Sequence, residues 1–112
     1  MRTAFHLTSG DEDHQNTVLT IAENLSKDET IEMDDIAVVA QAEGIDPVTR
    51  DGTHSDTVQE LLDSGIAFKA CSNTLDMMDL DDGDLVEGVE TVSSGASELT
   101  RLQEDGYAYL RP

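Results

Sequence analysis

Three stretches of the chain place apolar residues on one face of a helix. Val18, Ile21, Ala22 and Leu25 recur at i, i+3, i+4 and i+7 after a turn rich in N-capping side chains, which predicts a helix over about residues 13–27. Two further helices are indicated by Val58, Leu61 and Leu62 before Gly65, and by Ala96, Leu99 and Leu102 before Gly106. We expect the second of these three helices to begin at Thr53 or Ser55.

Short apolar runs between the helices are typical of strands. They cover residues 1–8, 36–40, 66–71, 89–92 and 107–110. The run Ile-Ala-Val-Val-Ala at 36–40 is apolar throughout, which indicates a strand covered on both faces and therefore a parallel sheet. Outside these patterns we expect a long loop over residues 41–55, and a short helical turn with an acidic loop over residues 75–84.

Strands and helices alternate along the whole chain. This alternation predicts an α/β fold in three layers, α/β/α, with about five mostly parallel strands and right-handed crossovers, in the manner of flavodoxin-like or Rossmann-like folds. The 112 residues are enough for one core, so we expect a single domain over residues 1–112, and no internal repeat is visible. The pattern leaves the strand order open.

Acidic side chains outnumber basic ones along the entire length. The chain has 25 acidic and 6 basic residues, a formal net charge of -19, and only two lysines, Lys27 and Lys69. Such a surface repels nucleic acid and anionic membranes, so we expect neither as a direct partner. We interpret the charge as an adaptation to a cytoplasm with molar salt, where self-repulsion is screened. A specific basic partner and a store of cations are the alternatives.

The expected location is the cytoplasm. The N-terminus has no signal-peptide pattern, and no apolar stretch approaches the roughly 20 residues that cross a bilayer. The single cysteine excludes an intramolecular disulfide and any metal site made only of cysteines.

The loops after the strands carry the candidate site, because ligands of open α/β sheets bind at the carboxyl ends of the strands. Cys71 is central to this set, as the nucleophile. The candidate binding residues around it are Ser9, Gly10, Glu43, Gly44, Ser72, Asn73, Thr74, Ser94 and Gly95.

Cys71 is the only thiol and stands at the end of the predicted strand 66–71. If the next residues open a helix, their free N–H groups stabilise the thiolate, which is the reactive form. The alternative is a buried cysteine that acts as a small hydrophobe. Asn73 either offers its amide to a ligand or caps the turn.

The three histidines are not placed to act as a base for Cys71. His6 lies inside the first strand as a hydrogen-bonded core residue, while His14 and His54 belong to helix-entry segments and are expected to be solvated. Residues 76–84 have the wrong spacing for a calcium loop, and no phosphate-binding glycine motif is present. We therefore expect neither a metal site nor a cofactor, and we expect Met77 and Met78 to pack against the domain.

Several segments of the C-terminal half carry a further signal: Cys71-Ser72-Asn73-Thr74-Leu75, residues 84–95, the pairs Glu98-Leu99 and Leu102-Gln103, and residues 106–112. In these segments the chain resembles the DsrE/DsrF-like family. The resemblance is specific over residues 66–112 and looser over Phe5-His6-Leu7, the first helix and the second strand. Similar proteins often carry a histidine before the glycine near residues 40–44, where this chain has Ala40-Gln41-Ala42-Glu43-Gly44.

The resemblance implies an α/β/α domain that assembles into homotrimers or hexamers. It also implies that Cys71 is the position that carries persulfide sulfur in the sulfur-relay relatives. Tyr107, Tyr109, Met77 and Met78 are then candidates for the contact between subunits.

Three functions remain open. The first is an intracellular sulfur carrier whose Cys71 accepts sulfur and passes it to a partner protein. The second is a non-catalytic, oligomeric module that binds a small ligand, with Cys71 as a pocket wall. The third is a scaffold in which Cys71 is buried and inert.

The charge generates a prediction about salt. Because carboxylates repel one another when screening is weak, we expect the melting temperature to fall when molar salt is replaced by millimolar salt. Differential scanning calorimetry over that range measures the change. A melting temperature that does not depend on salt would contradict adaptation to a saline cytoplasm.

Overall fold

A five-stranded parallel sheet forms the centre of the computed structural model, which describes residues 1–112. The strands pair in the order β4-β3-β2-β1-β5. None of the helices combines the length and the apolar character needed to span a membrane. The elements in chain order are β1 (Arg2–Leu7), α1 (Glu12–Ser26), β2 (Asp35–Ala40), the 3₁₀ helix η1 (Ala42–Val48), α2 (Ser55–Asp63), β3 (Ala67–Cys71), α3 (Ser72–Met77), the 3₁₀ turn η2 (Asp82–Asp84), β4 (Glu90–Val92), α4 (Gly95–Glu104) and β5 (Tyr107–Leu110).

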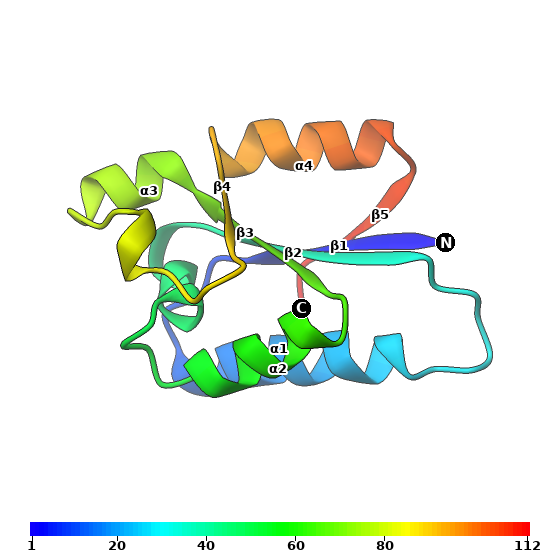
Figure 1. Cartoon of the computed structure of the whole chain (residues 1–112). Coiled ribbons are helices and arrows are strands. Elements are labelled where there is room, and N and C mark those ends of the chain that lie inside the picture. Colours follow the sequence, from blue (N-terminus) through cyan, green and yellow to red (C-terminus); the bar gives the residue numbers. More distant parts are fainter.

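The domain has the three layers that the alternating pattern predicts. Helices α1 and α2 cover one face of the sheet, and α4 covers the other (Figure 1). Successive side chains of a strand point to opposite faces, so Phe5 and Leu7 of β1 join a core of 18 buried residues beneath α1 and α2. Ala4 joins a smaller core of five residues beneath α4. The predicted α/β fold is thereby confirmed.

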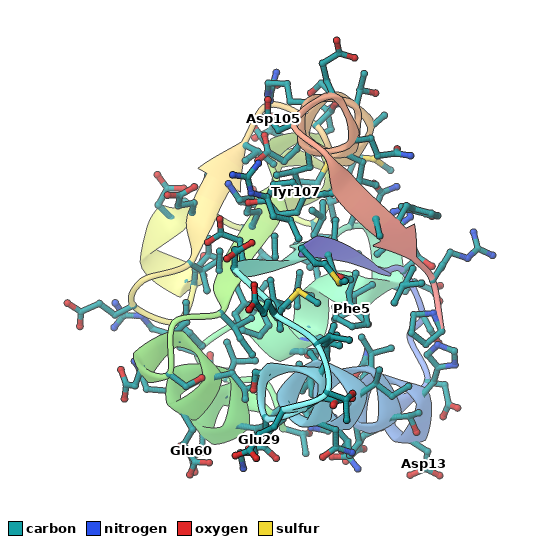
Figure 2. All side chains as sticks on the ribbon, turned by 90° about the vertical axis from the view of Figure 1, so that its right-hand side faces the viewer. Phe5, Asp13, Glu29, Glu60, Asp105 and Tyr107 are labelled. Carbon is teal, nitrogen blue, oxygen red and sulfur yellow. The ribbon has the colours of Figure 1, made fainter.

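The acidic side chains lie at the surface, with one exception. Asp13, Glu29, Glu60 and Asp105 lie at the periphery of the molecule, far from Phe5 in the core (Figure 2). Glu98 is the only acidic residue that is buried. The negative charge therefore belongs to a folded surface and not to a disordered segment.

The segment between β2 and α2 is more ordered than expected. The sequence predicts a loop over residues 41–55, but these residues contain η1, and Thr49 forms an antiparallel bridge with Leu85. Ile45 and Val48 of η1 are buried in the main core. A single 3₁₀ segment that includes a proline has no amphipathic repeat long enough to be recognised in the sequence.

Three further expectations are wrong in detail. Helix α3 begins at Ser72, directly after Cys71, and not near residue 75. His54 is only 8 % exposed, because it packs at the entry to α2 and is not solvated there. Met77 is 87 % exposed, because α3 turns Thr74 and Leu75 inward and leaves Met77 on the outer side.

The chain leaves the neighbouring strands β2 and β3 toward opposite faces of the sheet. The helices that follow β1 and β2 lie on one face of the sheet, whereas α3 and α4, which follow β3 and β4, lie toward the other (Figure 1). Chains that leave two neighbouring strands toward opposite faces open a crevice at the carboxyl ends of those strands. Cys71 is the last residue of β3, so it borders this crevice.

An ion pair between half-buried Lys69 and buried Glu98 joins β3 to α4. Nζ of Lys69 lies 2.8 Å from Oε2 of Glu98, and Arg101 binds the other carboxylate oxygen of Glu98 at 3.0 Å. Burial raises the pKa of the Glu98 carboxyl, but the hydrogen bonds from Lys69 and Arg101 outweigh burial and hold that pKa below its ordinary value. Lys69 stands two residues before Cys71 in β3, so the pair fixes α4 above the strand that carries the thiol.

We expect Glu98→Gln to lower the free energy of unfolding by about 1–3 kcal/mol, because it leaves Lys69 with only the exposed Glu90 as a counter-charge. Since the folded pKa of Glu98 is depressed, its contribution is present above the unfolded pKa, near 4.5, and is lost as the pH falls through the folded pKa. Urea unfolding of both proteins at neutral and acidic pH measures this difference.

Glu23→Gln is the matched control, because Glu23 forms an exposed ion pair with Lys27 at 3.7 Å. Loss of such a pair changes stability by about 0.5 kcal/mol or less. An effect of Glu98→Gln no larger than the effect of this control would contradict the structural role of the pair between Lys69 and Glu98.

Candidate functional site

Cys71 occupies the junction of β3 and α3. Its backbone has φ −68° and ψ 117°, the extended conformation of an N-cap residue, and helical residues begin at Ser72. The residue is buried, with 5 % of its surface exposed. The thiol thus stands at a strand end, as predicted, and the condition that a helix opens directly after it is met.

Residues at the starts of α3 and α4 line the pocket beside the Cys71 thiol. Burial raises the pKa of the thiol, but hydrogen bonds from the Thr74 hydroxyl and from the N–H groups of Thr74, Gly95 and Asn73 outweigh burial and lower it. The N–H groups at the start of a helix have no partner within that helix, which leaves them free for the thiolate. The arrangement thus stabilises the reactive form of the cysteine without a general base.

Thr74 connects the cysteine to the end of β2. Its Oγ1 accepts a hydrogen bond from the N–H of Ala42 at 2.9 Å, which leaves its hydroxyl proton available to the sulfur. Ala42 has φ 53°, an uncommon conformation for a residue with a side chain. The backbone strain lies beside the thiol, where the chain leaves β2.

A pocket of about 450 Å³ opens beside the cysteine. Of the predicted site residues, it is lined by Cys71, Asn73, Thr74, Ser94 and Gly95. Its other lining residues, which sequence reasoning did not place in the site, are Gln41, Ala42, Met77, Met78 and Ala96. Gln41 and Ala42 directly follow β2, so the rule that selects strand ends also points to them.

The remaining predicted residues lie elsewhere. Gly10 and Glu43 line a neighbouring acidic pocket of about 580 Å³, which shares Met78 with the cysteine pocket. Ser72 and Ser9 line neither pocket, and the Ser9 carbonyl accepts a hydrogen bond from Gln15 at 2.8 Å. Gly44 is required for packing, because a Cβ atom there would lie 2.2 Å from the carbonyl oxygen of Leu7.

The histidines do not line the cysteine pocket. Nδ1 of His6 lies 2.6 Å from the hydroxyl of Tyr109, at the opposite side of β2 from Cys71. The structure contains no group of three or more His, Cys, Asp or Glu side chains arranged to hold a metal ion. The pocket lining itself offers the Cys71 thiol and the polar side chains of Gln41, Asn73, Thr74 and Ser94.

Comparisons with known proteins agree with this architecture. The model of the DsrE/DsrF-like family matches residues 1–112. The solved structure of MTH1491, a protein of unknown function from Methanobacterium thermoautotrophicum, is 39% identical and has a TM-score of 0.92, with 99% of this chain and 98% of that chain covered.

A second solved structure shares the fold alone. BT1422, a conserved protein of unknown function from Bacteroides thetaiotaomicron, is 18% identical, with a TM-score of 0.80 over 99% of this chain and 94% of that chain. No curated protein matches the chain.

Proposed function

We propose that the chain, which belongs to the DsrE/DsrF-like family, carries sulfane sulfur as a persulfide on Cys71 and passes it to a partner protein. The observation that carries the proposal is the cysteine itself. It combines burial, a lowered pKa and N–H donors from two helices with an adjacent open pocket. A thiolate stabilised in this way exchanges sulfur without a histidine.

The transfer consists of two exchange steps. The Cys71 thiolate attacks the outer sulfur of a donor persulfide, a new S–S bond forms, and the donor thiolate leaves with the electron pair of the broken bond. An acceptor thiolate then attacks the outer sulfur on Cys71. The bond to Sγ breaks, and the Cys71 thiolate returns to the same N–H donors. Sulfane sulfur moves with no net oxidation, so neither step needs a redox co-reactant.

The pocket offers space and polar groups for the transferred atom. The amides of Gln41 and Asn73 line it, together with the start of α4 at Ser94 and Gly95. An anionic persulfide sulfur is stabilised by N–H donors of this kind. The buried position of Cys71 protects the thiol from bulky oxidants, while the pocket admits an extended thiol or persulfide.

A small-ligand module is the second candidate function. It is favoured by the apolar side of the pocket, where Met77, Met78 and Ala96 offer contacts to a ligand other than sulfur. In this case Cys71 is a wall of the pocket, and the reactivity of its thiol plays no part in the function. The behaviour of the thiol separates this function from the carrier.

We expect the folded protein to gain the mass of one sulfur atom when it is treated with a sulfane donor, and to lose it on reduction. Its rate of alkylation should rise with pH with a midpoint below the ordinary thiol pKa of about 8.5. Intact-mass spectrometry measures the gain of sulfur, and alkylation rates at a series of pH values in molar salt give the midpoint. An inert thiol that forms no sulfur adduct would contradict the carrier and favour the binding module.

Thr74→Val tests the source of the low pKa. It removes the hydroxyl and keeps the shape, so we expect the alkylation midpoint to rise by about one pH unit. Thr74→Ser retains the hydroxyl and is the matched control. If both variants behave like the parent protein, the Thr74 hydroxyl does not stabilise the thiolate.

We also propose that the chain assembles with copies of itself, as a homotrimer or hexamer. The large apolar side chains Met77, Met78, Tyr109 and Leu110 are exposed, at 87 %, 42 %, 40 % and 44 %, in a protein whose surface is otherwise strongly acidic. Tyr107 is a weaker candidate for the contact, because it packs against the smaller core.

Sedimentation in molar salt should therefore show a trimer or a hexamer, and Met77→Glu should weaken it. Ile21→Glu is the control, because Ile21 is an exposed apolar residue of α1, on the other face of the sheet (Figure 1). A monomeric parent protein would contradict self-association.

A further inference from the structure

The outer edge of β5 is not covered by any other element. β5 is the last strand in the order β4-β3-β2-β1-β5, so it pairs only with β1. Figure 2 shows no helix or strand outside it. Ala108, Tyr109 and Leu110 are all exposed. The edge of a strand presents N–H and C=O groups without partners, and these groups can pair with a strand of another chain.

The opposite edge of the sheet is protected against such pairing. β4 is only three residues long, it contains the charged Glu90, and the hydroxyl of Thr91 binds Asp82 at 2.6 Å. Short and charged edge strands discourage pairing with other chains. β5, in contrast, has the sequence Tyr-Ala-Tyr-Leu with no charged residue, in a chain of which 28% of the residues are charged. β5 is therefore the edge that a further strand can extend.

Opposite charges lie at the two ends of β5. Asp105 precedes the strand and Arg111 follows it, and each stands three residues from Ala108. Arg111 is the only one of the six basic side chains that forms neither an ion pair nor a hydrogen bond within the chain. The Asp105 carboxylate has no ion pair either. An exposed cation without a partner is unexpected in a chain with 25 acidic residues.

Antiparallel pairing of two copies would bring these two ends together. When Ala108 faces Ala108 of the second copy, position 111 of each strand lies on the side of position 105 of the other. The end of β5 that carries Arg111 then lies beside the end that carries Asp105, and this happens twice. A parallel arrangement would instead place the two Arg111 side chains next to each other, and like charges repel. The charges therefore favour the antiparallel arrangement about Ala108.

We propose that two copies of the chain join through β5, paired antiparallel about Ala108, so that their sheets become one continuous sheet. The inference rests on the self-association proposed above and not on the sulfur chemistry of Cys71. A contact of this kind has two-fold symmetry, so it gives an even number of subunits. It selects the hexamer, in which β5 joins two trimers, over the isolated trimer.

A cysteine at position 108 tests the register directly. In the Cys71→Ser background, which removes the only native thiol, Ala108→Cys places two thiols across the two-fold axis. Their Cα atoms are then about 4.5–5.5 Å apart, within the range of a disulfide. Leu110→Cys is the matched control, because its Cα atoms are offset by four residues along each strand, about 13 Å, which is too far. After oxidation with glutathione disulfide in molar salt, we expect about fivefold more linked dimer on a non-reducing gel for Ala108→Cys than for Leu110→Cys.

Ala108→Lys provides a second, independent measurement. It places two like charges opposite each other in the contact, at a position that is exposed in the single chain. We expect the assembly seen by sedimentation in molar salt to fall to about half the mass of the parent assembly. Thr20→Lys is the control, because it adds the same charge at an exposed position of α1 and should leave the mass unchanged.

The outcomes separate this contact from self-association in general. If the parent protein is a monomer, self-association fails and the contact through β5 fails with it, while the sulfur chemistry is unaffected. If the parent protein assembles but position 108 is linked no more than position 110, the contact through β5 alone is overturned. An Ala108→Lys protein with the mass of the parent assembly overturns it as well. Preferential linkage at position 108, with a halved mass for Ala108→Lys and an unchanged Thr20→Lys control, supports it.

Discussion

The contact between Lys69 and Glu98 is the constraint on which the candidate site depends. It is an ion pair of 2.8 Å between β3 and α4, and it involves the only buried acidic side chain of a strongly acidic chain. Burial of two charges is unfavourable unless they are paired and hydrogen-bonded, and Arg101 and Glu90 complete the network. The geometry that satisfies this network also sets the position of the N-terminus of α4.

The position of α4 in turn determines the environment of Cys71. The N–H of Gly95, the first residue of α4, is one of the donors to the thiolate, and the others come from the start of α3. Two helices that begin at neighbouring strand ends thus direct free backbone donors at one sulfur atom. Because these donors belong to the backbone, the lowered pKa of Cys71 depends on the fold and not on one particular side chain, apart from Thr74.

Backbone strain and a defined hydrogen bond occur together at the end of β2. Ala42 adopts a left-handed conformation where the chain leaves β2, and its N–H binds Thr74. Gln41, the residue before it, fills the space that a side chain at position 95 would need. Departures from regular backbone geometry are common at functional sites, where they direct polar groups toward a ligand. Here they surround the pocket that the thiol shares with two methionines.

The periodicity of apolar residues by itself determined the order of strands and helices, the parallel α/β class and the place of Cys71 at a strand end, because burial of apolar faces is encoded locally. The sequence also shows the excess of acidic over basic side chains. Only the tertiary structure decided the strand order, the burial of His54, the outward position of Met77 and the entry of Gln41 into the site. These features depend on contacts between residues far apart in the chain, such as Lys69 with Glu98 and His6 with Tyr109, and such contacts leave no local pattern in the sequence.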